Sequence, residues 1–83
     1  MNDDQIKEEP YIEDAVGRLV GKRCSIETTD GSLRVELVRS VGYSVIQFGK
    51  KARARFPTTL FFDEMQVDGV ELNVVEYIEV LSG

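Results

Sequence analysis

Alternation of apolar and polar residues is the feature that most constrains how this chain can fold. After Gly21 the residues at 24–28 alternate as they do in a half-buried β-strand, and a second alternating run covers residues 33–37. Asp30 and Gly31 lie between the two runs. Because Asp-Gly between alternating strands is typical of a tight hairpin, the chain is expected to be mainly β.

Turn residues divide the rest of the chain into further short strands. Gly42 is expected to bend the second strand, and Pro57 to end the segment that precedes it. The other expected strands cover residues 43–48, 59–67 and 70–81. Residues 49–56 are interpreted as an extension of the third strand, which would place Lys51, Arg53 and Arg55 on one face.

A helix is expected before the strands. Pro10 suits a first helical turn, apolar residues recur at helical spacing from Ile12 to Val20, and Gly21 can cap the end. The sequence thus predicts a helix at about 10–20. Residues 1–9 are predicted to be a disordered acidic tail, and residues 10–83 a single domain with strands at about 22–81.

The number of strands suggests how the domain closes. Five short strands with a glycine bend are expected to curl into a small, strongly bent barrel, with the helix at one end. The apolar last strand, within residues 74–81, has few of the features that protect a sheet edge from pairing. The chain is therefore expected to form a homo-oligomer through edge strands, as a ring if the pairing is head-to-tail and the rotation closes.

This order of elements resembles the Sm and Sm-like (Lsm, Hfq) family of SH3-like barrels. The resemblance lies in the following segments: Leu19-Val20-Gly21-Lys22-Arg23 at the helix end, residues 24–29 leading into Asp30-Gly31, the long strand at 33–41, and the closing strand at 75–80. It implies a helix followed by a five-stranded barrel, assembled as a ring that binds RNA.

Two motifs of that family differ here. Its first motif has an aspartate and an asparagine around an aromatic residue, and only the aromatic has a counterpart, in Gly42-Tyr43-Ser44. Its second motif has an Arg-Gly pair, for which this chain offers Asp68-Gly69 or Glu71-Leu72. The resemblance thus supports the barrel and the ring more than the usual nucleotide pocket.

Charge is distributed unevenly. The net charge is -5, yet nine of the ten lysines and arginines lie between Arg18 and Arg55, where there are three acids. The candidate nucleic-acid-binding residues are Lys50, Lys51, Arg53 and Arg55, with Tyr43 and Arg39. The expected ligand is single-stranded RNA or DNA, with RNA favoured over DNA. A basic run can neutralise phosphates, and aromatic rings near it can stack on bases.

Two other interpretations of the basic run remain open. The lysines and arginines could simply keep a solvated hairpin from pairing with other strands. Alternatively, the chain is a protein-interaction or structural assembly module, in which the acidic residues at 63–79 of one copy contact the basic half of its neighbour. The mass of the assembly at different ionic strengths distinguishes the two cases, because charge-based pairing is sensitive to salt and a salt-resistant ring leaves the basic run free for another partner.

Catalysis is not expected. The chain has no histidine and one cysteine, Cys24, which is expected to be buried in a strand. Asp63 and Glu64 are adjacent and would point to opposite faces of a strand. No metal or cofactor is expected. With no apolar stretch of about 20 residues and no signal peptide, the expected location is the cytoplasm, away from membranes.

Overall fold

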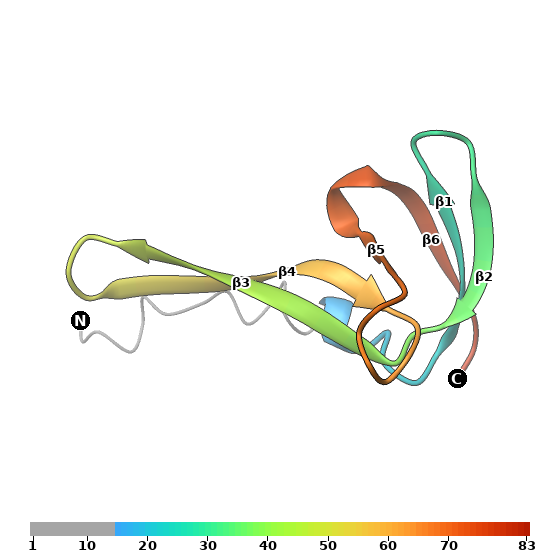
Figure 1. Ribbon diagram of the computed structural model, residues 1–83, viewed down its shortest axis with the longest axis horizontal. Coiled ribbons are helices and arrows are strands. Elements are labelled where there is room, and N and C mark those ends of the chain that lie inside the picture. Colours follow the sequence, from blue (N-terminus) through green and yellow to red (C-terminus); the bar gives the residue numbers. More distant parts are fainter. Residues whose placement is uncertain (1–14) are drawn as a thin grey trace.

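The computed structural model describes residues 15–83, which form two three-stranded antiparallel sheets (Figure 1). The elements in chain order are β1 (Arg23–Thr28), β2 (Leu33–Leu37), β3 (Ser40–Phe48), β4 (Ala52–Phe61), β5 (Gly69–Glu71), the 3₁₀ helix η2 (Leu72–Val74) and β6 (Val75–Ser82). One sheet has the order β2-β1-β6 and the other β3-β4-β5. The mainly β character predicted from the alternation is confirmed.

The hairpin of β1 and β2 forms as predicted at Asp30-Gly31. Gly31 has φ 88°, which a residue without Cβ adopts readily. The Asp30 carboxylate accepts hydrogen bonds from the Thr28 hydroxyl at 2.6 Å and from the Ser32 N–H at 2.9 Å. These bonds lower the pKa of the Asp30 carboxyl, the Thr28 bond contributing most, because they favour its charged form.

The two sheets are joined at Val38 and Arg39, between β2 and β3. The Val38 N–H donates to Lys22 O at 3.0 Å, and the Arg39 N–H donates to Phe61 O at 2.8 Å, so these neighbouring residues bond to different sheets. Val38 is fully buried, together with Cys24, Ile26 and Leu60. The core therefore lies where the two sheets meet.

The β3–β4 hairpin extends away from this core (Figure 1). The register shifts between Gly42 and Tyr43, which confirms the predicted bend. Beyond the shift, residues 43–57 form a two-stranded ribbon, here called the arm, and none of the fully buried residues belongs to it. The long axis of the molecule is 43 Å, against 26 Å and 24 Å for the other two axes.

The predicted barrel is wrong. The strands β5 and β6 are not hydrogen-bonded to each other, and the sheets stay separate at that side. The physical reason is the shape of the chain after residue 61: β5 has only three residues, and η2 redirects the chain before β6 begins. A closed five-stranded, Sm-like barrel is therefore not the architecture of this protein.

The predicted helix at 10–20 is also wrong over the part that the structure describes. Residues 15–17 are helical, and the chain then turns. The N–H of Leu19 donates to Val16 O and that of Val20 to Gly17 O, which are bonds between residues three apart. Gly17 weakens a helix by about 1 kcal/mol relative to alanine. Residues 10–14, and the tail predicted at 1–9, lie outside the described residues.

Several strand boundaries differ from the expected ones: β2 ends at Leu37 rather than at 41, and β3 begins at Ser40 rather than at 43. Residues 49–51 form a turn instead of extending β3. Pro57 does not end its segment, because β4 runs through it. Pro57 lies opposite Tyr43, next to the register shift, where a missing N–H is tolerated. The fourth strand ends at Phe61 rather than 67, and Met65 in the following loop is 82% exposed. Among residues 15–83 no helix has the length and apolar character to cross a membrane.

Candidate nucleic-acid interface

The arm has two different faces, because residues that oppose each other in an antiparallel ladder share a face. On one face Val45 opposes Arg55 and Gln47 opposes Arg53. On the other face Ile46 opposes Ala54. The first is here called the cationic face. Arg53 and Arg55 are exposed while Ala52, Ala54 and Phe56 are half-buried, as the expected alternation of this segment requires.

Tyr43 and Arg55 form a stacked pair on the cationic face. The guanidinium carbon Cζ of Arg55 lies 4.8 Å from the centre of the Tyr43 ring. This cation–π contact favours a guanidinium held flat against the ring. Tyr43 is half-buried, and a Cβ at Gly17 would lie 3.7 Å from its hydroxyl oxygen. The base of the arm thus positions the ring, and the ring positions Arg55.

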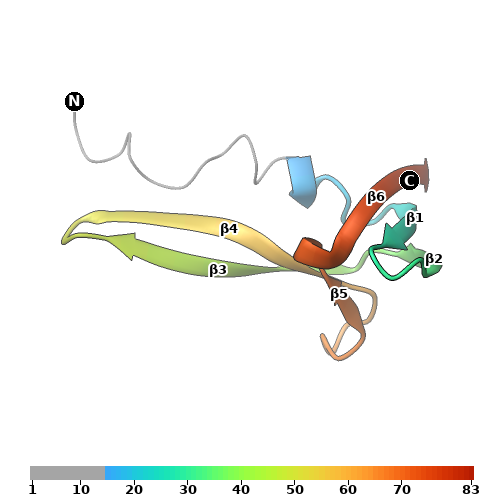
Figure 2. The same ribbon diagram turned by 90° about the horizontal axis from the view of Figure 1, so that it is seen from above.

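The tip of the arm is formed by the turn at 49–51. Gly49 has φ 68°, and its carbonyl accepts a hydrogen bond from Gln47 Nε2 at 3.0 Å. Lys50 and Lys51 follow and are exposed. A turn at this point sends the chain back along β3, so Arg53 and Arg55 lie beside residues 45–47 rather than farther out. The turn, not strand extension, brings four basic residues onto one short ribbon (Figure 2).

Two basic residues outside the arm, Arg34 and Arg39, are paired with acids. Arg34 contacts Glu36 at 2.8 Å and Asp68 at 3.1 Å, and its guanidinium lies 4.7 Å from the centre of the Phe62 ring. Arg39 contacts Glu64 at 3.5 Å. Within residues 15–83 no acid is in ion-pair distance of Lys50, Lys51 or Arg53.

The structure does not bring Arg39 to the arm. Arg39 precedes β3, whereas Lys50 and Lys51 follow its other end, and nine strand residues span about 30 Å. Five of the six predicted residues, Tyr43, Lys50, Lys51, Arg53 and Arg55, lie on the arm. Sequence reasoning missed Val45 and Gln47, which share the cationic face. The Gly49-Lys50 turn was the signal that could have identified them.

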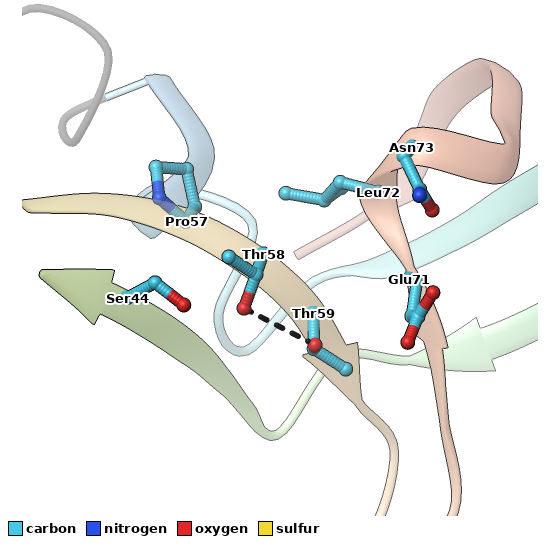
Figure 3. Close-up of a pocket in the computed structure, with 7 residues that line it drawn as sticks. All are labelled: Ser44, Pro57, Thr58, Thr59, Glu71, Leu72 and Asn73. Carbon is cyan, nitrogen blue, oxygen red and sulfur yellow. Dashed lines mark hydrogen bonds between the residues drawn. The ribbon is translucent and has the colours of Figure 1, made fainter. Parts of the chain in front are cut away.

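A pocket of about 420 Å³ lies at the base of the arm (Figure 3). It is lined by Ser44, Pro57, Thr58, Thr59, Glu71, Leu72 and Asn73. The Thr58 hydroxyl donates to Gly42 O at 3.3 Å and lies 3.3 Å from the Thr59 hydroxyl. Glu71 is the charged group, so the pocket repels phosphate and favours neutral, hydrogen-bonding groups.

Cys24, the single cysteine of the chain, is buried in β1 and is not in a disulfide. Burial raises the pKa of the Cys24 thiol against the opposing effect of Lys22, so the thiol stays protonated near neutral pH. No three acidic or cysteine side chains within residues 15–83 are close enough together to hold a metal ion. What the arm can do chemically is bind anions and stack on planar groups.

A scan against protein-family models, a search of curated proteins and a search of solved structures found no match to this chain.

Proposed function

We propose that this protein binds single-stranded nucleic acid, RNA in preference to DNA, through the cationic face and tip of the arm. The observation that carries the proposal is the clustering on the arm of three exposed cations that are in no ion pair within residues 15–83. Arg34 and Arg39 are in ion pairs with acids of the same chain, whereas Lys50, Lys51 and Arg53 are exposed and in no ion pair within residues 15–83.

Each group has a separate role in this proposal. Lys50, Lys51 and Arg53 neutralise phosphates, and the release of counterions supplies most of the affinity. Arg55 lies on the Tyr43 ring, so this pair places two planar groups beside the residues that neutralise phosphates. The pocket beside the arm, with its hydroxyl and amide groups, suits a base edge or a sugar. None of these groups reads a defined sequence.

Fluorescence anisotropy with labelled oligo-U, oligo-A and single-stranded DNA tests this proposal, with a DNA duplex for comparison, at two salt concentrations. The variant Lys50→Ala/Lys51→Ala/Arg53→Ala is expected to lose most of the affinity. Because each neutralised phosphate contributes about 0.7 to the salt slope on a single strand, its slope should fall by about 2.

A matched control removes three exposed charges elsewhere. Arg18→Ala/Arg23→Ala/Arg39→Ala has the same net charge as the arm variant, and each of the three positions is exposed and outside residues 43–57. It should keep the affinity and salt slope of the wild type. Equal losses in both triple variants would mean that net charge, and not the arm, determines binding. Tighter binding of duplex would reject the single-stranded ligand.

A role in assembly alone is the second candidate. It is favoured by the ion pairs of Arg34 with Asp68 and of Arg39 with Glu64, each of which joins the basic segment of this chain to its acidic segment. In this case the arm would contact acids of a neighbouring copy. Association that disappears when salt is raised, with no binding to any oligonucleotide, would support this role against the first.

A further inference from the structure

The strand β2 leaves one edge without a hydrogen-bonding partner. It is the edge strand of the sheet β2-β1-β6, and within residues 15–83 no strand pairs with its other side. Its register with β1 runs from Leu33 to Leu37 without a shift. β2 contains no lysine or proline, which often protect such edges. A regular, unprotected edge is a template for another strand.

The side chains of β2 point the opposite way from those of an ordinary amphipathic strand. Leu33 opposes Glu27 and Val35 opposes Ser25 on the outer face of the sheet, while the core residue Ile26 opposes Arg34. Leu33 is 65% exposed and Val35 50% exposed. Single exposed apolar residues are ordinary. A row of them along a free edge indicates an interaction surface.

We propose that β2 pairs with β2 of a second copy, antiparallel, about a two-fold axis at Val35. Leu33 then opposes the partner's Leu37, and Val35 opposes the partner's Val35. On the other face Arg34 opposes the partner's Glu36. Reversal of Leu-Arg-Val-Glu-Leu thus matches each apolar residue with an apolar one and each charge with its opposite. This complementarity is why a second copy, and not another protein, is the occupant.

The other strand edges fit a two-fold pairing less well. β6 contains Glu76 and Glu79 with no basic residue, so self-pairing would bring like charges together, and its register with β1 shifts twice. β3 has a register shift at Gly42 and Tyr43. A two-fold pairing of β2 closes after two copies. The inference therefore replaces the ring expected from the sequence with a dimer, and it does not depend on nucleic-acid binding.

Sedimentation equilibrium over about 1 μM to 1 mM, a range that covers weak and moderate association, tests the dimer. The wild type is expected to convert from monomer to dimer within this range. Val35→Lys places two ammonium groups opposite each other and should weaken association at least about 10-fold. Val45→Lys is the matched control, because Val45 is a strand valine of similar exposure, 53%, on the arm, and it should associate like the wild type.

Disulfide formation tests the register. Oxidised Val35→Cys should give a covalent dimer, because residues directly opposite each other have Cβ atoms about 4.5–5.5 Å apart. Leu33→Cys should not, because its two copies would lie about 13 Å apart along the strands, beyond disulfide reach. A wild type that stays monomeric throughout, equal association of the two lysine variants, or faster cross-linking of Leu33→Cys than of Val35→Cys would overturn the inference.

Discussion

The part of the molecule around the core and the arm are built from the same kind of strand, yet they use their side chains differently. Near the core, apolar residues from both sheets are fully buried, as Ile26 and Leu60 are, and two arginines, Arg34 and Arg39, are paired with acids. The four residues found fully buried all lie outside the arm, and Lys50, Lys51 and Arg53 are in no ion pair within the described part of the chain. Under the proposed function, the region around the core supplies stability and the arm supplies binding.

The largest expected effect is on core packing. Ile26→Ala removes a fully buried side chain and should lower the free energy of unfolding by about 2–5 kcal/mol, much of the total for a domain of this size. Ile46→Ala, at a residue of the arm that is 45% exposed, should cost about 1 kcal/mol or less. Urea unfolding measures both. Similar losses would show that the arm contributes to stability as the core does.

Glycine substitutions compare the same regions. A Cβ at Gly69 would lie 2.5 Å from Leu60 O, and both residues belong to the paired strands β4 and β5, so Gly69→Ala should cost about 1–3 kcal/mol. Gly49 at the tip has φ 68° and no atom near its Cβ position, so Gly49→Ala carries only the backbone cost of about 1–2 kcal/mol. Thermal unfolding compares the two variants. Nucleic-acid affinity should fall only with Gly49→Ala, which distorts the tip.

Removal of Arg34, which is in ion pairs, should mainly lower stability, whereas removal of Arg53, which is in no ion pair within residues 15–83, should mainly weaken binding. Arg34→Ala breaks two half-exposed ion pairs and the contact with Phe62, and is expected to lower stability by about 1 kcal/mol without changing affinity for oligo-U. Arg53→Ala should change stability by less than about 0.5 kcal/mol and weaken binding. Unfolding and anisotropy on both variants separate the effects, and a loss of stability with Arg53→Ala would contradict the contrast.

Acidification should lower the stability of the molecule without changing the charge of the arm. The folded-state pKa of Asp30 is lowered, so its stabilising contribution is present above its ordinary value of 3.8 and is lost as the pH falls through the lower folded value. The arm residues 43–57 contain no titratable acid and no histidine, so their charge is constant across this window. Asp30→Asn should show a smaller loss of unfolding free energy than the wild type as the pH falls from about 5 to 2.

Local patterns in the sequence were sufficient to predict some elements. The Asp30-Gly31 hairpin, the bend at Gly42 and the alternation of Arg53 and Arg55 with alanines follow from turn chemistry and period-2 spacing, and all are present. The reversal at 49–51 was missed because an exposed Gly-Lys-Lys run fits a turn and a charged edge strand equally well.

Tertiary contacts explain the larger differences. Whether five strands close into a barrel depends on whether the first and last edges meet, and the three-residue β5 and η2 prevent this. Alternation placed Leu33, Val35 and Leu37 on one face of the second strand, and in the structure Leu33 and Val35 of that face are exposed. A period of two identifies two faces but not which of them meets the core.

An NMR titration of the ¹⁵N-labelled protein with oligo-U tests most directly whether the arm is the binding region. The expected result is that the amide shifts change along residues 43–57, most strongly at Lys50, Lys51 and Arg53, while those of β1 and β6 stay in place. The perturbation should vanish in the Lys50→Ala/Lys51→Ala/Arg53→Ala variant. Shift changes concentrated in β1, β2 or β6, or no change along the arm at saturating oligo-U, would contradict the proposal that the unpaired cations of the arm bind nucleic acid.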